Sequence, residues 1–144
     1  MIDAAIALQL DKAGFGTYGQ NIFFGLSPIM DTGQVTQREG IYVNATTVSV
    51  TGDQYTDQIT ISTRFRDVLK QGRYLMRLLA WQRDTLCDTC ELDCRTILDM
   101  SYRWVDIQPS TAVDMDAIDG EGRWIKAIRF TVSYKLPPEL PPIG

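Results

Sequence analysis

The three cysteines, Cys87, Cys90 and Cys94, lie close together with the spacing C-x-x-C-x-x-x-C. On a helix this spacing would place the three thiols on one face. A structural zinc site usually takes four Cys or His ligands in two separated pairs, and this chain has no fourth cysteine and no histidine. Asp88, Asp93 or another subunit would have to complete a zinc or iron–sulfur site. The sequence therefore favours free cysteines in a reducing compartment, where a disulfide would form only on exposure to oxidant.

A second chemical pattern is the segment GFGTYG, in which Gly14, Gly16 and Gly19 match the G-x-G-x-x-G fingerprint of dinucleotide-binding proteins. That fingerprint requires a strand before the glycines and a helix after them, because the helix N-terminus binds the pyrophosphate. Here the order is reversed, with helical spacing before Gly14 and a strand pattern from Asn21. We therefore interpret GFGTYG as a turn between a helix and a strand.

Carboxylates gather in one short segment that also contains two glycines. The pattern of a twelve-residue calcium loop ending in a bidentate Glu is absent from it. A solvated acidic loop is the favoured interpretation. The four carboxylates are Asp114, Asp116, Asp119 and Glu121.

The remaining routes to catalysis are weak. Without histidine, no Ser-His-Asp arrangement can form, and the commonest general base is missing. The lysines considered as nucleophiles have no motif around them. The sequence therefore predicts that the chain is not an enzyme and assigns no catalytic, cofactor-binding or metal-binding residue. These lysines are Lys12, Lys70, Lys126 and Lys135.

The composition is that of one soluble globular domain, with 144 residues, 44% hydrophobic and 22% charged. A net charge of −4 argues against a dedicated nucleic-acid binder, which needs a basic face. No apolar run approaches the ~20 residues that span a bilayer. Asp3 and Asp11 disfavour a signal peptide at the N-terminus.

Helical spacing predicts a helix over residues 2–13, with Ile2, Ala5 and Ile6 in its apolar stripe, and Gly14 as its stop. Residues 21–28 are typical of a short buried strand, and the polar segment 31–40 indicates an exposed loop. A period of two then predicts antiparallel strands over residues 41–50 and 59–65. We expect a turn, or the tip of a longer loop, at residues 51–53.

Residues 67–82 return to helical spacing, and we expect an amphipathic helix whose apolar side faces the sheet. Polar residues lie mostly outside the apolar stripe, at Lys70, Arg73, Arg77 and Gln82. The stripe itself consists of Val68, Gly72, Leu75 and Leu79, widened by Leu69 and Met76.

Two more strands follow in the second half of the chain. Residues 101–107 alternate as one strand, and an acidic connection over residues 109–122 leads to the last strand, residues 124–135. The sequence therefore predicts a two-layer α+β fold, with two helices packed on one face of a mainly antiparallel (mixed) β-sheet. We expect one domain over residues 1–135 and an extended Pro-rich tail over residues 136–144. In the last strand one face carries Trp124, Ile128, Phe130, Val132 and Tyr134.

The order of these segments resembles the tail-terminator and minor-capsid (head–tail joining) proteins of tailed bacteriophages. A helix runs into the turn and strand of GFGTYGQNIFFGLSP. A strand then leads directly into the long second helix in ITISTRFRDVLKQGRYLMRLL. Last, PSTAVDMDAIDGEGRWIKAIRFTVSY enters the final strand. The cysteine cluster and the Pro-rich tail depart from the pattern.

The resemblance implies a structural subunit of a homo-oligomeric ring, expected to be a hexamer, that caps the tail tube, stops its polymerisation and joins tail to head. The implied partners are further copies of the chain, the tail-tube protein and a head-completion (neck) protein. DNA passes through the lumen without specific binding, and no membrane is involved. The implied location is the virion neck at the end of the tail, after assembly in the host bacterial cytoplasm. We expect the contacts in loops 30–40, 51–57 and 110–122 and in the tail 136–144.

Several alternatives stay open. In the same connector region, the chain could be a head-completion (stopper) protein or a tail-tube subunit. From another class, it could be a non-catalytic host binding or adaptor module. A third class is a metal-dependent or redox protein built on Cys87, Cys90 and Cys94.

Overall fold

The computed structural model describes residues 2–25, 39–89, 91–93, 101–103, 105–110, 112–113, 117–118 and 122–135. Two helices, one short 3-10 helix and nine strands follow one another in these parts of the chain. They are α1 (Ile2–Lys12), β1 (Ile22–Phe24), β2 (Gly40–Thr51), β3 (Gln54–Phe65), α2 (Val68–Asp84), η3 (Leu86–Asp88), β4 (Glu91–Asp93), β5 (Ser101–Arg103), β6 (Asp106–Ile107), β7 (Ala112–Val113), β8 (Ala117–Ile118) and β9 (Trp124–Lys135).

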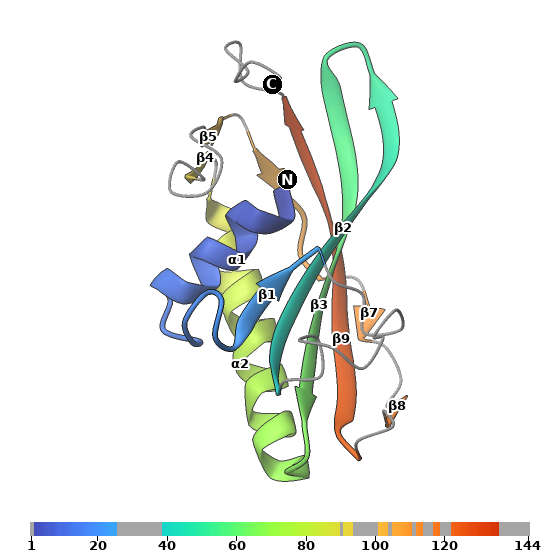
Figure 1. The fold of residues 1–144 in the computed structure, drawn as a ribbon. Helices are drawn as coiled ribbons and strands as arrows, with labels where there is room; N and C mark the ends of the chain where they lie inside the picture. Colours follow the sequence, from blue (N-terminus) through green and yellow to red (C-terminus); the bar gives the residue numbers. More distant parts are fainter. Residues whose placement is uncertain are drawn as a thin grey trace, which may run out of the picture.

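The main sheet has the strand order β1-β2-β3-β9-β6, and β7 and β8 also pair with β9. β1 is parallel to β2, whereas the other pairs are antiparallel. Both helices lie on one face of this sheet, α1 against β1 and β2, and α2 against β3 and β9 (Figure 1). β4 and β5 form a separate antiparallel pair that contacts α1. The predicted two-layer α+β fold with a mixed, mainly antiparallel sheet is confirmed.

The first helix and the turn after it match the sequence prediction closely. α1 is buried on almost every side of its first two turns, because it lies between the main sheet and the β4–β5 pair. Gly14 and Gly19 have φ angles of 86° and 87°, a conformation that L side chains rarely adopt. The Tyr18 N–H donates to Asp11 Oδ2 at 2.9 Å, and the Thr17 N–H donates to Asn21 Oδ1 at 2.6 Å. GFGTYG is therefore a turn held by its own neighbours, as predicted.

β2 and β3 form a long hairpin closed by Gly52 and Asp53, with a φ of 62° at Gly52. Two expected loop boundaries were wrong. Gly40 belongs to β2, and residues 54–57 belong to β3, because β9 continues alongside them from Gln54↔Lys135 onward. The pairing of β2 with β3 is shifted by a bulge between Thr47 and Ser49.

The second helix begins where the sequence predicts, but it is rotated. The side chain of Asp67 caps it by accepting from the Leu69 and Lys70 N–H groups at 2.9 and 3.3 Å. Of the expected apolar stripe, only Leu75 is buried, whereas Val68, Leu69 and Met76 are 55%, 69% and 72% exposed. The face against the sheet is formed instead by Gln71, Leu75, Leu78 and Gln82.

The two glutamines explain this rotation. Gln71 Nε2 donates to the Thr63 carbonyl at 3.0 Å, and Gln82 Nε2 donates to the Gln108 carbonyl at 2.7 Å. Gln82 Oε1 accepts from both the N–H and the hydroxyl of Ser110, at 2.7 and 2.8 Å. A buried side-chain amide costs little when backbone groups accept and donate its hydrogen bonds. The helix face that carries Gln71 and Gln82 can therefore pack against the sheet.

The region after α2 differs from prediction in two places. Residues 101–107 are not one strand: β5 pairs with β4, whereas β6 pairs with β9. Tyr102 and Val105 are both buried, so the side-chain alternation breaks between them as the chain passes from one sheet to the other. The acidic connection is also not simply a loop, because β7 and β8 within it pair with β9.

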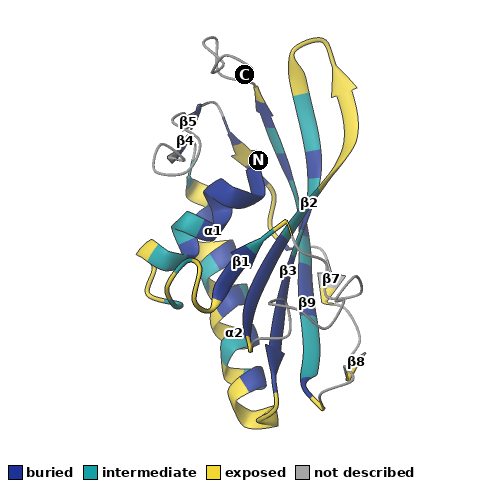
Figure 2. Ribbon diagram, viewed as in Figure 1, coloured by how far each residue is buried: buried dark blue, intermediate teal, exposed yellow. Residues whose placement is uncertain are grey.

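The core lies between the helices and the inner face of the sheet, as the dark blue segments of Figure 2 show. Ile128, Phe130, Val132 and Tyr134 of β9 are buried there, on the face predicted for them. None of the helices in the described parts of the chain is long and apolar enough to cross a membrane. Most of loop 30–40 and all of the tail 136–144 lie outside the described residues.

Candidate interaction surfaces

Of the three cysteines, the structure describes Cys87. Cys87 lies in η3, directly after α2, and its half-buried thiol accepts a hydrogen bond from Gln82 Nε2 at 3.4 Å. Burial raises the pKa of this thiol, and the hydrogen bond from Gln82 partly opposes that rise. Cys90 and Cys94 lie outside the described residues, so the geometry of the three is not defined. Within the residues that the structure describes, no three His, Cys, Asp or Glu side chains gather to hold a metal ion.

Of the other residues singled out for chemistry, the structure describes the four lysines, and these are not brought together. Asp114, Asp116, Asp119 and Glu121 fall outside the described ranges. The four lysines lie on α1, α2 and two distant positions of β9. Lys70 lies over the ring of Phe65, with Nζ 5.1 Å from the ring centroid, and Lys135 Nζ lies 4.0 Å from Asp53 Oδ2. These are surface contacts without a shared site.

The most exposed regular element is the distal half of the β2–β3 hairpin, residues 45–56, which we call the arm. It extends past the helices to one end of the molecule, and its β2 side is yellow in Figure 2 because it is exposed. Residues 46–51 are all exposed, and Val48 and Val50 are 56% and 54% exposed. Two apolar side chains on a strand without a covering layer are a typical contact surface.

The outer edge of the arm also lacks a strand partner. The Ile41 N–H donates to the Asn21 carbonyl at 2.8 Å, and the Val43 carbonyl accepts from the Gly25 N–H at 3.0 Å. Successive residues of a strand direct their backbone N–H and C=O groups to opposite sides. The N–H and C=O groups of Ala45 and Thr47 therefore point to the same outer side as those of Ile41 and Val43. On this outer side, opposite β3, no strand in the described part of the chain pairs with residues 45–51.

The composition of this edge is unusual for an isolated protein. Soluble proteins protect long edges with charged side chains, proline or bulges. Residues 45–51 carry no charge and no proline, and only the bulge between Thr47 and Ser49 interrupts them. At ~3.3 Å per residue, the seven residues present an edge of about 23 Å to a partner.

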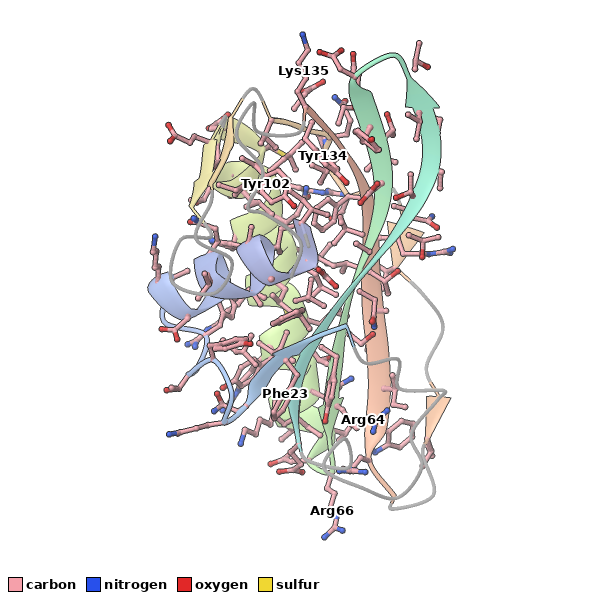
Figure 3. The ribbon with its side chains drawn as sticks, turned by 45° about the horizontal axis from the view of Figure 1, so that its top comes forward. Phe23, Arg64, Arg66, Tyr102, Tyr134 and Lys135 are labelled. Carbon is pink, nitrogen blue, oxygen red and sulfur yellow. The ribbon has the colours of Figure 1, made fainter. Side chains whose placement is uncertain are left out.

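The β3 side of the arm is anchored to β9 by aromatic and polar contacts. Tyr134 Oη donates to the buried Asp57 Oδ2 at 3.0 Å, and Tyr55 stacks on Tyr134 with centroids 5.7 Å apart. Tyr102 meets Tyr134 edge-on at 5.2 Å, as Figure 3 shows. Burial first, and then Asp57, raises the pKa of the Tyr134 hydroxyl, which stays protonated as the donor. The arm is therefore held by β9 along its β3 side, as far as the pair Gln54↔Lys135, while its β2 side remains open.

A second exposed surface is the side of α2 that faces away from the sheet. We define the α2 outer face as Leu69, Gly72, Arg73, Met76 and Arg77. Two large apolar side chains alternate there with two guanidinium groups, and Arg73 and Arg77 are both exposed. An apolar stripe with flanking charges is the pattern of a helix that packs against another surface.

Gly72 is informative within this face. A glycine in a helix interior costs about 1 kcal/mol relative to alanine, and a Cβ added at Gly72 would meet no atom within 4 Å. The packing of the residues that the structure describes therefore gives no reason for glycine at this position. A close approach by something outside the subunit would give one.

The two surfaces carry opposite charge. Residues 68–83 of α2 contain four cations and no carboxylate, so they contribute +4. Since the whole chain carries −4, the rest of it carries −8. Residues 40–63, which include the arm, contain Asp53 and Asp57 and no lysine or arginine.

Sequence reasoning identified part of these surfaces. The tip of the arm lies in the expected contact segment 51–57, but the outer side of β2 was not singled out. The uncharged run over residues 45–51 was the available signal. Leu69, Gly72 and Met76 of the α2 outer face were assigned to the buried stripe instead, because they follow helical spacing as a buried stripe would, whereas Arg73 and Arg77 were placed outside that stripe.

Neither a scan against protein-family models nor a search of curated proteins gives a match to this chain. The surfaces of the molecule and the order of its segments therefore carry the functional inference.

Proposed function

We propose that the chain is a non-catalytic structural protein of a tailed-bacteriophage virion, a tail terminator. Its subunits form a homo-oligomeric ring that caps the tail tube, stops its polymerisation and joins the tail to the head. The order of sequence segments supports the phage setting, and the two-layer α+β fold agrees with what that resemblance implies.

The observation that carries the proposal is the arm. Residues 45–51 along its outer edge carry no charged side chain, and their outward backbone groups are open to a partner. Val48 and Val50 of the same segment are exposed. Such an edge pairs with or packs against another chain, because an exposed β-edge is a template for association. An arm anchored on its β3 side and open on its β2 edge suits a protein whose task is assembly.

The nearest alternatives are a head-completion (stopper) protein and a tail-tube subunit, which would use the same arm in another ring of the connector. An adaptor module is the alternative from another class. It would stay monomeric and capture one soluble partner. The cysteine-based metal protein would contain stoichiometric zinc or iron, and it would lose its fold on Cys90→Ser.

The experiment is electron microscopy of tails assembled with and without this protein, together with elemental analysis of the purified chain. We expect rings at the tail ends when the protein is present and overlong tubes when it is absent. Tails of normal length in its absence would exclude the terminator role. Tails of normal length that fail to join heads would indicate the stopper, and loss of tubes altogether would indicate the tube subunit.

A further inference from the structure

We infer that the α2 outer face is the docking site for the arm of a neighbouring copy of this chain. This inference rests on the proposed ring and names its contact. Each subunit would give its arm to one neighbour and receive the arm of the other on Leu69, Gly72 and Met76.

The two surfaces are placed for contact between subunits. The tip of the arm lies at one end of the molecule and the beginning of α2 at the opposite end, as Figure 1 shows. They therefore cannot meet within one subunit. A contact between two different surfaces is heterologous, and heterologous contacts close into rings when the rotation between subunits allows it.

The surfaces also match in size and chemistry. The outer edge of the arm is about 23 Å long, and the 17 residues of α2 span about 26 Å. Val48 and Val50 offer apolar surface to Leu69 and Met76, all of them more than half exposed. The small Gly72 would let a strand approach the helix closely.

Charge favours this occupant over a second α2. Two copies of the α2 outer face would bring Arg73 and Arg77 of one copy against the same two cations of the other, which opposes their association. Residues 45–56 of the arm contain no cation. Asp53 at its tip is 80% exposed and lies 4.0 Å from Lys135 Nζ, so the arm adds no repulsion of its own toward a cationic face. Arg73 and Arg77 are the exposed cations of the α2 outer face that such a carboxylate would approach.

Nucleic acid is the other anionic partner to weigh against the arm. Phosphate binding requires cations and makes no use of exposed apolar side chains. Leu69 and Met76, at 69% and 72% exposure, occupy the middle of the cationic face. The combination of apolar and cationic side chains favours a protein surface over a phosphate backbone.

The test uses two variants of the full chain, each with one surface disabled. Val48→Lys/Val50→Lys disables the arm, and Arg73→Glu/Met76→Glu disables the α2 outer face. All four side chains are exposed, so both variants should melt as the wild type does. If either does not, Val50→Ser and Leu69→Ser replace the two double substitutions. Val113→Lys, at another exposed apolar position, is the matched control and should assemble as the wild type does.

The assembly state is measured by light scattering during size-exclusion chromatography, for each variant alone and for their equimolar mixture. We expect each variant alone to be monomeric. The mixture should give a 1:1 dimer, because one arm and one α2 outer face remain intact and only one contact can form. At about 0.1 mM of each chain, a contact with a Kd of about 1 μM would be nearly saturated.

Two results would overturn the inference: a mixture that stays monomeric, or a single variant that assembles as the wild type does. Binding of a short DNA duplex that Arg73→Glu/Met76→Glu abolishes, without a 1:1 dimer in the mixture, would assign the helix to nucleic acid instead. The proposed function is judged separately by microscopy. Wild-type rings without the mixed dimer refute only the docking site, and a mixed dimer without rings on tails refutes only the terminator role.

Discussion

Tyr134 and Asp57 join the last strand to the β3 side of the hairpin through one buried hydrogen bond of 3.0 Å. Asp57 is 4% exposed, and its other carboxylate oxygen, Oδ1, has no hydrogen-bond partner. The tyrosine hydroxyl is therefore the side-chain donor that partly compensates this buried carboxylate. Removing it leaves the carboxylate with the full cost of its burial.

Tyr134→Phe should lower the free energy of unfolding at neutral pH by about 1–3 kcal/mol, the usual cost of leaving a buried polar group without its partner. Above a pH of about 10, the difference in unfolding free energy between the wild type and Tyr134→Phe changes with pH. The unfolded tyrosine loses its proton near that value, whereas the folded Tyr134 keeps it because burial and Asp57 raise its pKa. The stability that this pKa shift contributes is present below a pH of about 10 and is lost as the pH rises further.

The measurement is urea unfolding at pH values from about 7 to about 11. Above pH 10 the slope for Tyr134→Phe should be shallower than that of the wild type by up to about 1.4 kcal/mol per pH unit, the value for one proton. Tyr74→Phe, which removes a tyrosine at the side of α2, is the control. If the unfolding free energies of the wild type and Tyr134→Phe fall in parallel above a pH of about 10, the raised pKa of Tyr134 is contradicted.

Gln82 and Gln71 are both buried on α2 but make different numbers of hydrogen bonds. Gln82 bonds the carbonyl of Gln108 and two groups of Ser110, whereas Gln71 bonds the Thr63 carbonyl and leaves its own Oε1 without a partner. Gln82→Leu should therefore lower the free energy of unfolding by about 2–3 kcal/mol, and Gln71→Leu by about 1 kcal/mol or less. Chemical denaturation of the two variants side by side checks this, and equal losses would show that the Ser110 contact contributes little.

At the scale of elements, α2 shows what a sequence pattern can and cannot determine. Its limits follow from local chemistry, because Asp67 before an apolar-periodic run is a helix start whatever the tertiary structure is. Its orientation does not. Leu69 and Met76 fit a buried stripe as well as Leu75 and Leu78 do, and only the partners of Gln71 and Gln82, supplied by distant backbone, decide between them.

Among the strands, too, features set by local sequence were predicted and features set by distant contacts were not. β9 was predicted with its correct buried face, because Ile128, Phe130, Val132 and Tyr134 repeat at period two within one long strand. The segment 101–107 was predicted as one strand because a period of two continues through a change of sheet. Pairing of β7 and β8 with β9 depends on long-range contacts, and short strands of two residues leave no periodicity to detect.

Gly72→Ala separates the needs of the helix from those of an interface. The added methyl meets no atom of the subunit within 4 Å, so the variant should gain up to about 1 kcal/mol of unfolding free energy through helix propensity. The same methyl should weaken assembly if a partner approaches this position closely. Thermal melting and light scattering measure the two effects. A variant that is more stable and assembles as the wild type does would contradict a close approach at Gly72.

At the scale of the whole molecule, the charge distribution divides the chain into a cationic helix and an otherwise anionic subunit. The helix contributes +4 over residues 68–83, against −8 for everything else. A heterologous contact between the arm and α2 pairs these regions in every copy, so that each subunit carries both halves of the interface. A self-complementary dimer through α2 would instead bring like charges together.

Hydrogen exchange of the wild-type chain tests this arrangement without any substitution. In the monomer, the outward amides of Ala45 and Thr47 should exchange rapidly, because no strand of the described chain accepts from them. On assembly, protection should rise together in residues 45–51 and 69–77, since both halves of one contact become covered at the same step. Residues 105–110, bonded to Gln82 and β9 within the subunit, should not change and serve as the internal control. Protection that rises at residues 45–51 alone would mean that the arm pairs with a surface other than α2.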